Sequence, residues 1–272
     1  MVFKREYPMN LNDVIDHVHD TKDTTQTVPE KWGQGRATFG GLVAAMMYEK
    51  IPRDVSADRA IKSITLSFVA PVAPGNLDIM VKILRAGKAA TQVQVTAYQG
   101  DAVCAVMLAS FGGARESSIA VDYENAPTTT QPEDVPAFPF IPNLTPDFTQ
   151  YFDYRFTEGK MPFMGSTQTI MGGWIKLKEP CAQPVSVAQI LALLDAWPPA
   201  VFSMLKKPTT GSSLTWTISF MDLPEQATAD EWWQYEANIQ HAQDGYSHID
   251  STMWDINGKP VALSRQTVSV FG

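Results

Sequence analysis

The sequence is poor in cysteine and histidine and has no cluster of basic residues. Cys104 and Cys181 are the only cysteines in 272 residues, and their wide separation predicts two reduced thiols rather than a disulfide framework. The formal net charge is −8, and lysine and arginine do not cluster beyond short pairs such as Lys4–Arg5. Binding to a nucleic-acid backbone needs clustered basic residues, and an acidic surface disfavours anionic membranes. We therefore expect neither nucleic acid nor membrane as a partner.

Long hydrophobic runs are also missing. The N-terminal residues MVFKREYPMNLND lack the continuous apolar core of a signal peptide, and no window approaches the roughly 18 apolar residues of a membrane span. Together with the reduced cysteines, this predicts a cytoplasmic protein. The chain nonetheless has 44% hydrophobic and 18% charged residues, so it can bury a sizeable core, unlike a disordered segment.

Two common catalytic patterns are absent from the sequence. No G-x-S-x-G motif of a serine hydrolase occurs, and neither cysteine has an adjacent histidine, so a covalent acyl-enzyme is disfavoured. His17-x-His19-Asp20 resembles a metal-ligand cluster, but positions i and i+2 of a helix point apart and no further histidine or cysteine lies nearby. We expect no metal and no cofactor.

Proline is concentrated in one segment. Residues 126–146, APTTTQPEDVPAFPFIPNLTP, contain six prolines and show no helical or strand periodicity. Because proline removes amide donors and fixes φ, this segment fits neither a helix interior nor a sheet. It predicts a connection over 126–150 between an N-terminal unit (1–125) and a C-terminal unit (151–272), with Phe138 and Phe140 packed onto the protein.

The two units repeat the same order of elements. Each begins with a mostly apolar helix and continues with four strands of alternating polarity and short turns, which predicts an antiparallel sheet. The first helix is expected over 39–51 and its strands over 60–71, 76–87, 91–100 and 102–113; the second helix is expected over 186–205 and its strands over 212–224, 231–242, 247–258 and 260–272. This pattern indicates an internal duplication.

Both predicted helices lack a polar face, and such a helix is buried on nearly all sides. Ser186 and Gln189 form a capping box at the start of the second helix. An antiparallel sheet can bury a helix in this way only by curling around it, which is the hotdog fold. The expected architecture is α+β, a double hotdog with two curved antiparallel sheets, each wrapped around a long central helix. Asp195 is the one charge in this second helix, and an ionised carboxylate is costly to bury without a partner.

Segments in both halves match a known family in order and spacing. They are FGGLVAA (39–45), SITLSFVAPVAPG (63–75), LRAGKAATQVQVTAYQG (84–100), GGWIKL (172–177), LLDAWPPA (193–200), SLTWTISFMDLP (213–224) and LSRQTVSVFG (263–272). With them the chain resembles the acyl-CoA thioesterase II-like family of double-hotdog thioesterases. The resemblance implies an enzyme that hydrolyses acyl-CoA to a free acid and CoA.

The resemblance also implies a water-activating trio in the C-terminal unit. Carried over by position, the family's aspartate falls on Asp195, its glutamine on Gln266 and its hydroxyl on Ser213. Ser212 and Thr215 remain alternatives for the hydroxyl, because the chain departs from the Thr-x-Asp of better-known members here.

The residues themselves support these roles in part. Desolvation raises the pKa of a carboxylate, which makes Asp195 a better base than an exposed aspartate. Strand alternation places Gln266 on the inward face, whereas Ser213 is expected to face away unless its strand bends. Gly40 and Gly41 open the first helix, where uncovered amides bind an oxyanion.

Other interpretations of the same residues remain open. Asp195 could pair with Arg265 instead, or cap the helix where Pro198 and Pro199 break it. The corresponding part of the first helix, AAMMY, has no acid, so we expect one working site per chain. Trp32, Met46, Met47, Met161 and Phe163 are candidates for an acyl tunnel.

Two rival functions compete with hydrolysis. One is a non-catalytic protein that binds acyl-CoA or another acyl thioester. The other is a hotdog-fold hydratase, although no G-D-x-N-P-x-H motif occurs. By analogy of fold alone, we expect a homodimer or a higher homo-oligomer.

Overall fold

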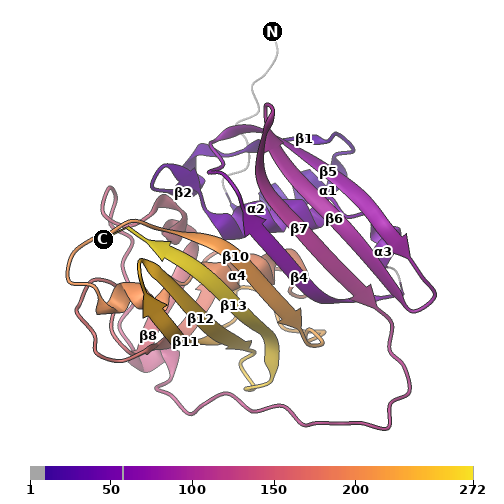
Figure 1. The fold of residues 1–272 in the computed structure, drawn as a ribbon. Coiled ribbons are helices and arrows are strands. Elements are labelled where there is room, and N and C mark those ends of the chain that lie inside the picture. Colours follow the sequence, from indigo (N-terminus) through magenta and orange to yellow (C-terminus); the bar gives the residue numbers. More distant parts are fainter. Residues whose placement is uncertain (1–9, 57, 272) are drawn as a thin grey trace.

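The computed structural model describes residues 10–56 and 58–271, so Lys4–Arg5 lies outside the described residues. Within these ranges, one antiparallel 11-stranded sheet has the order β1-β5-β6-β7-β4-β10-β13-β12-β11-β9-β8, and β2 pairs with β3 separately (Figure 1). The strands are β1 (Thr25–Val28), β2 (Gly33–Gln34), β3 (Ala37–Thr38), β4 (Ala60–Phe68), β5 (Gly75–Ala86), β6 (Ala90–Gln99), β7 (Ala102–Gly112), β8 (Phe152–Glu158), β9 (Ile170–Leu177), β10 (Gly211–Phe220), β11 (Trp233–Gln243), β12 (Tyr246–Trp254) and β13 (Pro260–Val270). The helices are α1 (Leu11–Asp20), α2 (Gly40–Glu49), α3 (Arg53–Ser56) and α4 (Val187–Asp195), with short 3-10 turns η1 (Glu30–Trp32), η2 (Pro132–Asp134), η3 (Asp147–Tyr151) and η4 (Ala200–Met204).

The two halves of the sheet mirror one another in strand order. From the centre outward, β4-β7-β6-β5 corresponds to β10-β13-β12-β11, as the predicted duplication requires. The expectation of two separate sheets is not met, because β4 and β10 pair directly, with Ile64 opposite Ile218 and Leu66 opposite Trp216. An unpaired edge strand exposes a row of amides and carbonyls, and this pairing satisfies two such edges at once.

The helices α2 and α4 lie side by side on the same side of the sheet (Figure 1). They run in opposite directions, since Gly40 at the start of α2 lies beside Asp195 at the end of α4. Their side chains are buried almost throughout, as the lack of a polar face predicts. The capping box of Ser186 and Gln189 is present at the start of α4.

The second helix is shorter than the predicted range 186–205. It ends at Asp195, and after Pro198 and Pro199 the chain forms only the short turn η4. Proline cannot donate an amide to the preceding turn, and it disfavours helical geometry in the residue before it. Asp195 is therefore the last residue of a helix rather than a charge in the middle of one, and neither α2 nor α4 is the long central helix that we expected.

One window does reach the length and apolarity of a membrane span, contrary to the sequence expectation. Residues Val187–Met204 have a mean hydropathy of 1.4 over 18 residues, and 67% of this window is buried inside the fold. A buried core helix meets the same criteria. Because the window holds the short helix α4, a proline pair and η4, its apolarity is explained by packing in the core.

The proline-rich connection lies along the C-terminal half of the molecule (Figure 1). The indole of Trp174 donates to Thr130 O at 2.8 Å, and the amide of Gln234 donates to Pro127 O at 2.8 Å. Phe138 packs against the core, and its N–H donates to Tyr154 O at 3.1 Å. These contacts hold the connection against β8, β9 and β11 of the C-terminal half.

Candidate active site

Asp195 meets the start of the other central helix. The side chain of Gln266, on β13, donates from Nε2 to Asp195 Oδ1 at 2.9 Å. A Cβ atom added to Gly40 would lie 2.9 Å from Asp195 Oδ2, so only glycine leaves room for the carboxylate there. Residues from α4, β13 and α2 thus converge on one carboxylate.

A cavity of about 110 Å³ opens onto this carboxylate. It lies between the two halves of the chain, since residues of both line it. The lining residues are Gln34, Ala37, Thr38, Gly40, Phe68, Asp195, Trp197, Pro199, Phe202, Gly211, Ser212, Ser213 and Gln266. The volume is enough for a few water molecules beside the carboxylate.

The environment of Asp195 favours a proton acceptor that works near neutral pH. Burial raises its pKa from 3.8 to about 7, although the hydrogen bond from Gln266 and the backbone amide of Gly41 each lower it. The side chain is only partly accessible, and its access to solvent is through the cavity. A base is most effective when its pKa lies close to the working pH.

The two glycines at the start of α2 have different surroundings. The Gly41 amide is directed at the Asp195 carboxylate, whereas Gly40 lines the cavity. Within the described residues, the N-cap Phe39 makes no side-chain capping hydrogen bond. The first amides of a helix have no intrahelical partner, and Gly40 is the residue of this first turn that lines the cavity.

The strand β10 is irregular where the candidate hydroxyls lie. Its register against β13 shifts between Ser213 and Thr215, and such a bulge changes which side chains share a face. Ser212 and Ser213 both line the cavity with Asp195, and Thr215 is not among its lining residues. The strand is therefore irregular at Ser213, where the predicted inward orientation requires a departure from simple alternation.

The alternative ion pair for Asp195 does not form. Arg265 Nη2 donates to Asp250 Oδ2 at 2.8 Å on the exposed face of the sheet. Gln266, the next residue on β13, points to the opposite face and reaches Asp195. Alternation along one strand thus separates the structural ion pair from the buried site.

Several cavity residues were not predicted from the sequence. Trp197 stacks on Tyr235 with ring centroids 5.0 Å apart and meets Phe156 edge-on at 5.0 Å. Phe68 and Phe202 complete the apolar part of the wall. The sequence signal for Trp197 was the segment AWPPA directly after Asp195, which lay inside the predicted helix 186–205.

The residues expected to line an acyl tunnel lie in three different places. Trp32, Met46 and Met47 are fully buried in the core. Phe163 lines an apolar cavity beside the Asp195 site, and Met161 lines a different cavity under the connection.

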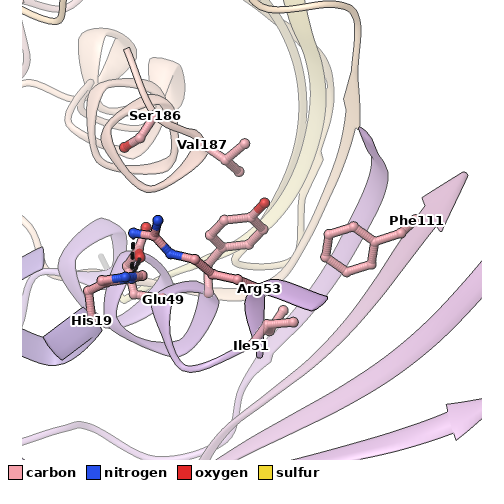
Figure 2. A pocket seen from close by; sticks show the side chains of 8 residues that line it. His19, Glu49, Ile51, Arg53, Phe111, Ser186 and Val187 are labelled. Carbon is pink, nitrogen blue, oxygen red and sulfur yellow. Dashed lines mark hydrogen bonds and ion pairs between the residues drawn. The ribbon is translucent and has the colours of Figure 1, made fainter. Parts of the chain in front are cut away.

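The opposite end of the helix pair holds a larger cavity of about 520 Å³ (Figure 2). Glu49 ends α2 there and faces Ser186 and Val187 at the start of α4. His19 Nδ1 lies 3.1 Å from Glu49 Oε2 and 3.3 Å from Arg53 Nη2.

Comparison with known proteins identifies the family. A family model described as the acyl-CoA thioesterase N-terminal domain matches residues 28–112, and one described as the acyl-CoA thioesterase C-terminal domain matches residues 132–270. No curated protein matches the chain.

Solved structures show the same fold at low sequence identity. A hot dog fold protein of unknown function from Alicyclobacillus acidocaldarius has a TM-score of 0.80 at 22% identity, covering 95% of this chain and 98% of its own. A tesB protein from Mycobacterium avium subs paratuberculosis (TM-score 0.76, 16% identity, 97% and 100% covered) and acyl-CoA thioesterase II TesB2 from Mycobacterium marinum (0.75, 19%, 94% and 98%) are similar. The large antiparallel sheet around few helices fits this hotdog fold. The two family models together span most of the sequence, so the chain belongs to the acyl-CoA thioesterase family and is a thioester hydrolase.

Proposed function

We propose that this protein hydrolyses acyl-CoA to a free acid and CoA by direct attack of water, with Asp195 as the general base. The observation that carries the proposal is the Asp195 carboxylate itself, which is held at a cavity by Gln266 and Gly41 and has a pKa raised to about 7. Family membership supports the substrate class.

The reaction needs one water molecule in the cavity beside Asp195. Asp195 takes a proton from this water while the water oxygen bonds to the carbonyl carbon of the thioester, giving a tetrahedral oxyanion. The oxyanion collapses as the carbon–sulfur bond breaks, and the sulfur leaves with the electron pair of that bond. Asp195 returns the proton to the departing sulfur, which regenerates the carboxylate and releases the thiol of CoA.

The hydrogen-bonding groups around the cavity divide the remaining tasks. Gln266 donates to Asp195 Oδ1 and so fixes the carboxylate, and its own carbonyl is an acceptor for the attacking water. The Gly40 amide at the positive end of α2 stabilises the oxyanion. The hydroxyl of Ser213, or of Ser212 beside it, is the further group that holds the water.

The test is release of CoA thiol, followed with a thiol reagent across acyl chain lengths. Asp195→Asn keeps the size of the side chain and an acceptor for Gln266, and we expect it to lose at least about 100-fold in turnover while remaining folded. Asp222→Asn is the matched control, because Asp222 is exposed on the surface. Equal turnover of wild type and Asp195→Asn would refute the assigned base.

The same assay separates the rival functions. Tight binding of acyl-CoA without thiol release would favour a non-catalytic acyl-binding protein. Consumption of an unsaturated acyl-CoA without thiol release would favour a hydratase.

We also propose the remaining organisation inferred from the sequence. The chain consists of units 1–125 and 151–272 joined by 126–150, acts in the cytoplasm, and assembles into at least a homodimer. Light scattering of the purified protein tests the assembly, and a monomer at micromolar concentration would contradict it.

A further inference from the structure

A second cavity adjoins the Asp195 cavity. It has a volume of about 390 Å³ and shares Gln34, Pro199, Phe202 and Gly211 with its neighbour. The remaining lining residues are Gly35, Phe138, Leu144, Pro146, Phe148, Thr149, Tyr154, Phe156, Pro162, Phe163, Ala196, Pro198, Pro208, Thr209 and Thr210. We call this space the aromatic pocket.

The aromatic pocket suits an uncharged apolar group. Among residues 10–56 and 58–271, none of those lining it is an Asp, Glu, Lys, Arg or His. The Tyr154 hydroxyl, its most buried polar group, already donates to Ala196 O at 3.1 Å. A charged or strongly polar occupant would lose its hydration there without replacement.

The walls of the aromatic pocket are stiff. Phe138 packs on Phe156 with ring centroids 5.5 Å apart, and Tyr154 and Phe156 both meet Trp197 at 5.9 and 5.0 Å. Prolines from four separate segments of the chain also line the pocket. Aromatic faces favour flat or edge-on partners, and stiff walls favour a compact group over a long flexible one.

A pair of phenylalanines stands where the two cavities join. Phe202 lines both cavities and stacks on Phe163 with ring centroids 5.5 Å apart and planes 27° from parallel. The N–H of Phe163 donates to Phe202 O at 2.7 Å. Phe163 has φ of 66°, a left-handed conformation that is rare for a bulky side chain, so this backbone contact holds the ring in place against its local preference.

We propose that the aromatic pocket receives the acyl group of the substrate and selects compact, uncharged acyl groups, aromatic ones above all, with Phe202 and Phe163 setting the size limit. The inference rests on the proposed function, because the carbonyl carbon must sit in the Asp195 cavity while its substituent enters through Phe202. The volume of about 390 Å³ lies at the small end of the roughly 300–1,000 Å³ typical of ligand pockets.

The test compares kcat/KM for phenylacetyl-CoA, butyryl-CoA and dodecanoyl-CoA. We expect wild type to favour phenylacetyl-CoA over dodecanoyl-CoA by at least about tenfold, the discrimination that a few apolar groups give in an apolar pocket. Phe202→Ala and Phe163→Ala should each enlarge the pocket and reduce this preference about tenfold. Tyr123→Ala is the control, because Tyr123 is an exposed aromatic residue that lines neither cavity, and it should leave the preference unchanged.

Calorimetric binding of the same thioesters to Asp195→Asn separates this inference from the proposed function. If the wild type hydrolyses no thioester but Asp195→Asn still binds phenylacetyl-CoA more tightly than dodecanoyl-CoA, the proposed function is wrong and the inference about the pocket is supported. A wild type that binds and hydrolyses dodecanoyl-CoA best would overturn the inference. So would a preference that neither phenylalanine variant changes while both variants remain folded.

Discussion

The two ends of the helix pair have the same arrangement of helix termini, but the acid at each end has a different partner. At one end Asp195 closes α4 and faces the start of α2; at the other, Glu49 closes α2 and faces the start of α4 (Figure 2). Burial raises the pKa of both acids. The Asp195 partner is a neutral amide, Gln266, whereas the Glu49 partner is His19, which can itself carry a charge.

The starts of the two helices differ in how their first amides are capped. At the start of α4, Ser186 and Gln189 cap each other's amides. At the start of α2, Gly40 and Gly41 follow Phe39, which makes no capping hydrogen bond among the described residues. A duplicated scaffold thus places an acid of raised pKa beside a helix start twice, but only the start of α4 carries a capping box.

The largest expected contrast is between the two acids. Asp195→Asn should lower turnover at least about 100-fold, whereas Glu49→Gln should change it less than about twofold because Glu49 touches a different cavity. Thiol release under saturating substrate measures both. A comparable loss in Glu49→Gln, with the fold intact by circular dichroism, would show that the two ends are functionally equivalent.

The two helix starts give the next contrast. In Gly40→Ala the new Cβ would lie 2.9 Å from Asp195 Oδ2 and 3.0 Å from Phe68 Cζ, so the carboxylate or the ring must move. Misplacement of a reacting group by about 1 Å costs up to 100-fold in rate, so we expect turnover to fall by at least about tenfold. Ser186→Ala should instead cost about 1 kcal/mol of stability by removing a cap and leave turnover unchanged. A loss of turnover in Ser186→Ala with unchanged turnover in Gly40→Ala would contradict this account.

The neutral partner of Asp195 offers a third test. Gln266→Met keeps the length of the side chain but removes the hydrogen bond that lowers the Asp195 pKa. The pKa should rise further, so turnover at pH 7 should fall at least about tenfold, in line with the loss of one hydrogen bond to a charged group, and recover in part at higher pH. Gln240→Met is the control, since Gln240 is exposed on β11. A shift of the pH–rate profile of Gln266→Met to lower pH would contradict the expected rise in the Asp195 pKa.

The smallest effects are expected at the hydroxyls. Either Ser213→Ala or Ser212→Ala should lower turnover by about tenfold or less, the range for one neutral hydrogen bond. Thr215→Ala should have no effect, because Thr215 lies beyond the register shift and outside the cavity. A loss confined to Thr215→Ala would move the hydroxyl role to that residue.

The strands were predictable because their polarity alternates and short turns separate them. All eight strands expected from the duplication are present within a few residues of their predicted bounds, and so is the capping box at Ser186. Helix α1 and strands β1, β8 and β9 were not predicted. The pairing of β4 with β10 depends on tertiary contacts between sequence-distant edges, which local polarity does not encode.

The candidate site was predictable only in part. Position in the family pattern pointed to Asp195 and Gln266, and the structure brings them to 2.9 Å. The helix boundary at Asp195 was missed because the apolar run continues through the prolines. Glu49 was missed as its counterpart because it lies one position beyond the segment AAMMY, and the aromatic pocket was missed because its walls come from segments far apart in the chain.

The pH dependence of kcat/KM tests the central claim most directly. A base must be ionised to work, and Asp195 has a pKa of about 7 against 3.8 for an ordinary aspartate, so the rate should rise through about pH 7 and level off above it. Asp195→Asn should lose this step in the rate. It should also be more stable than wild type above pH 7 but not near pH 4, because the substitution removes a charge that burial disfavours. A wild-type rate that is already constant from pH 5 upward, or an unchanged step in Asp195→Asn, would contradict the role assigned to this carboxylate.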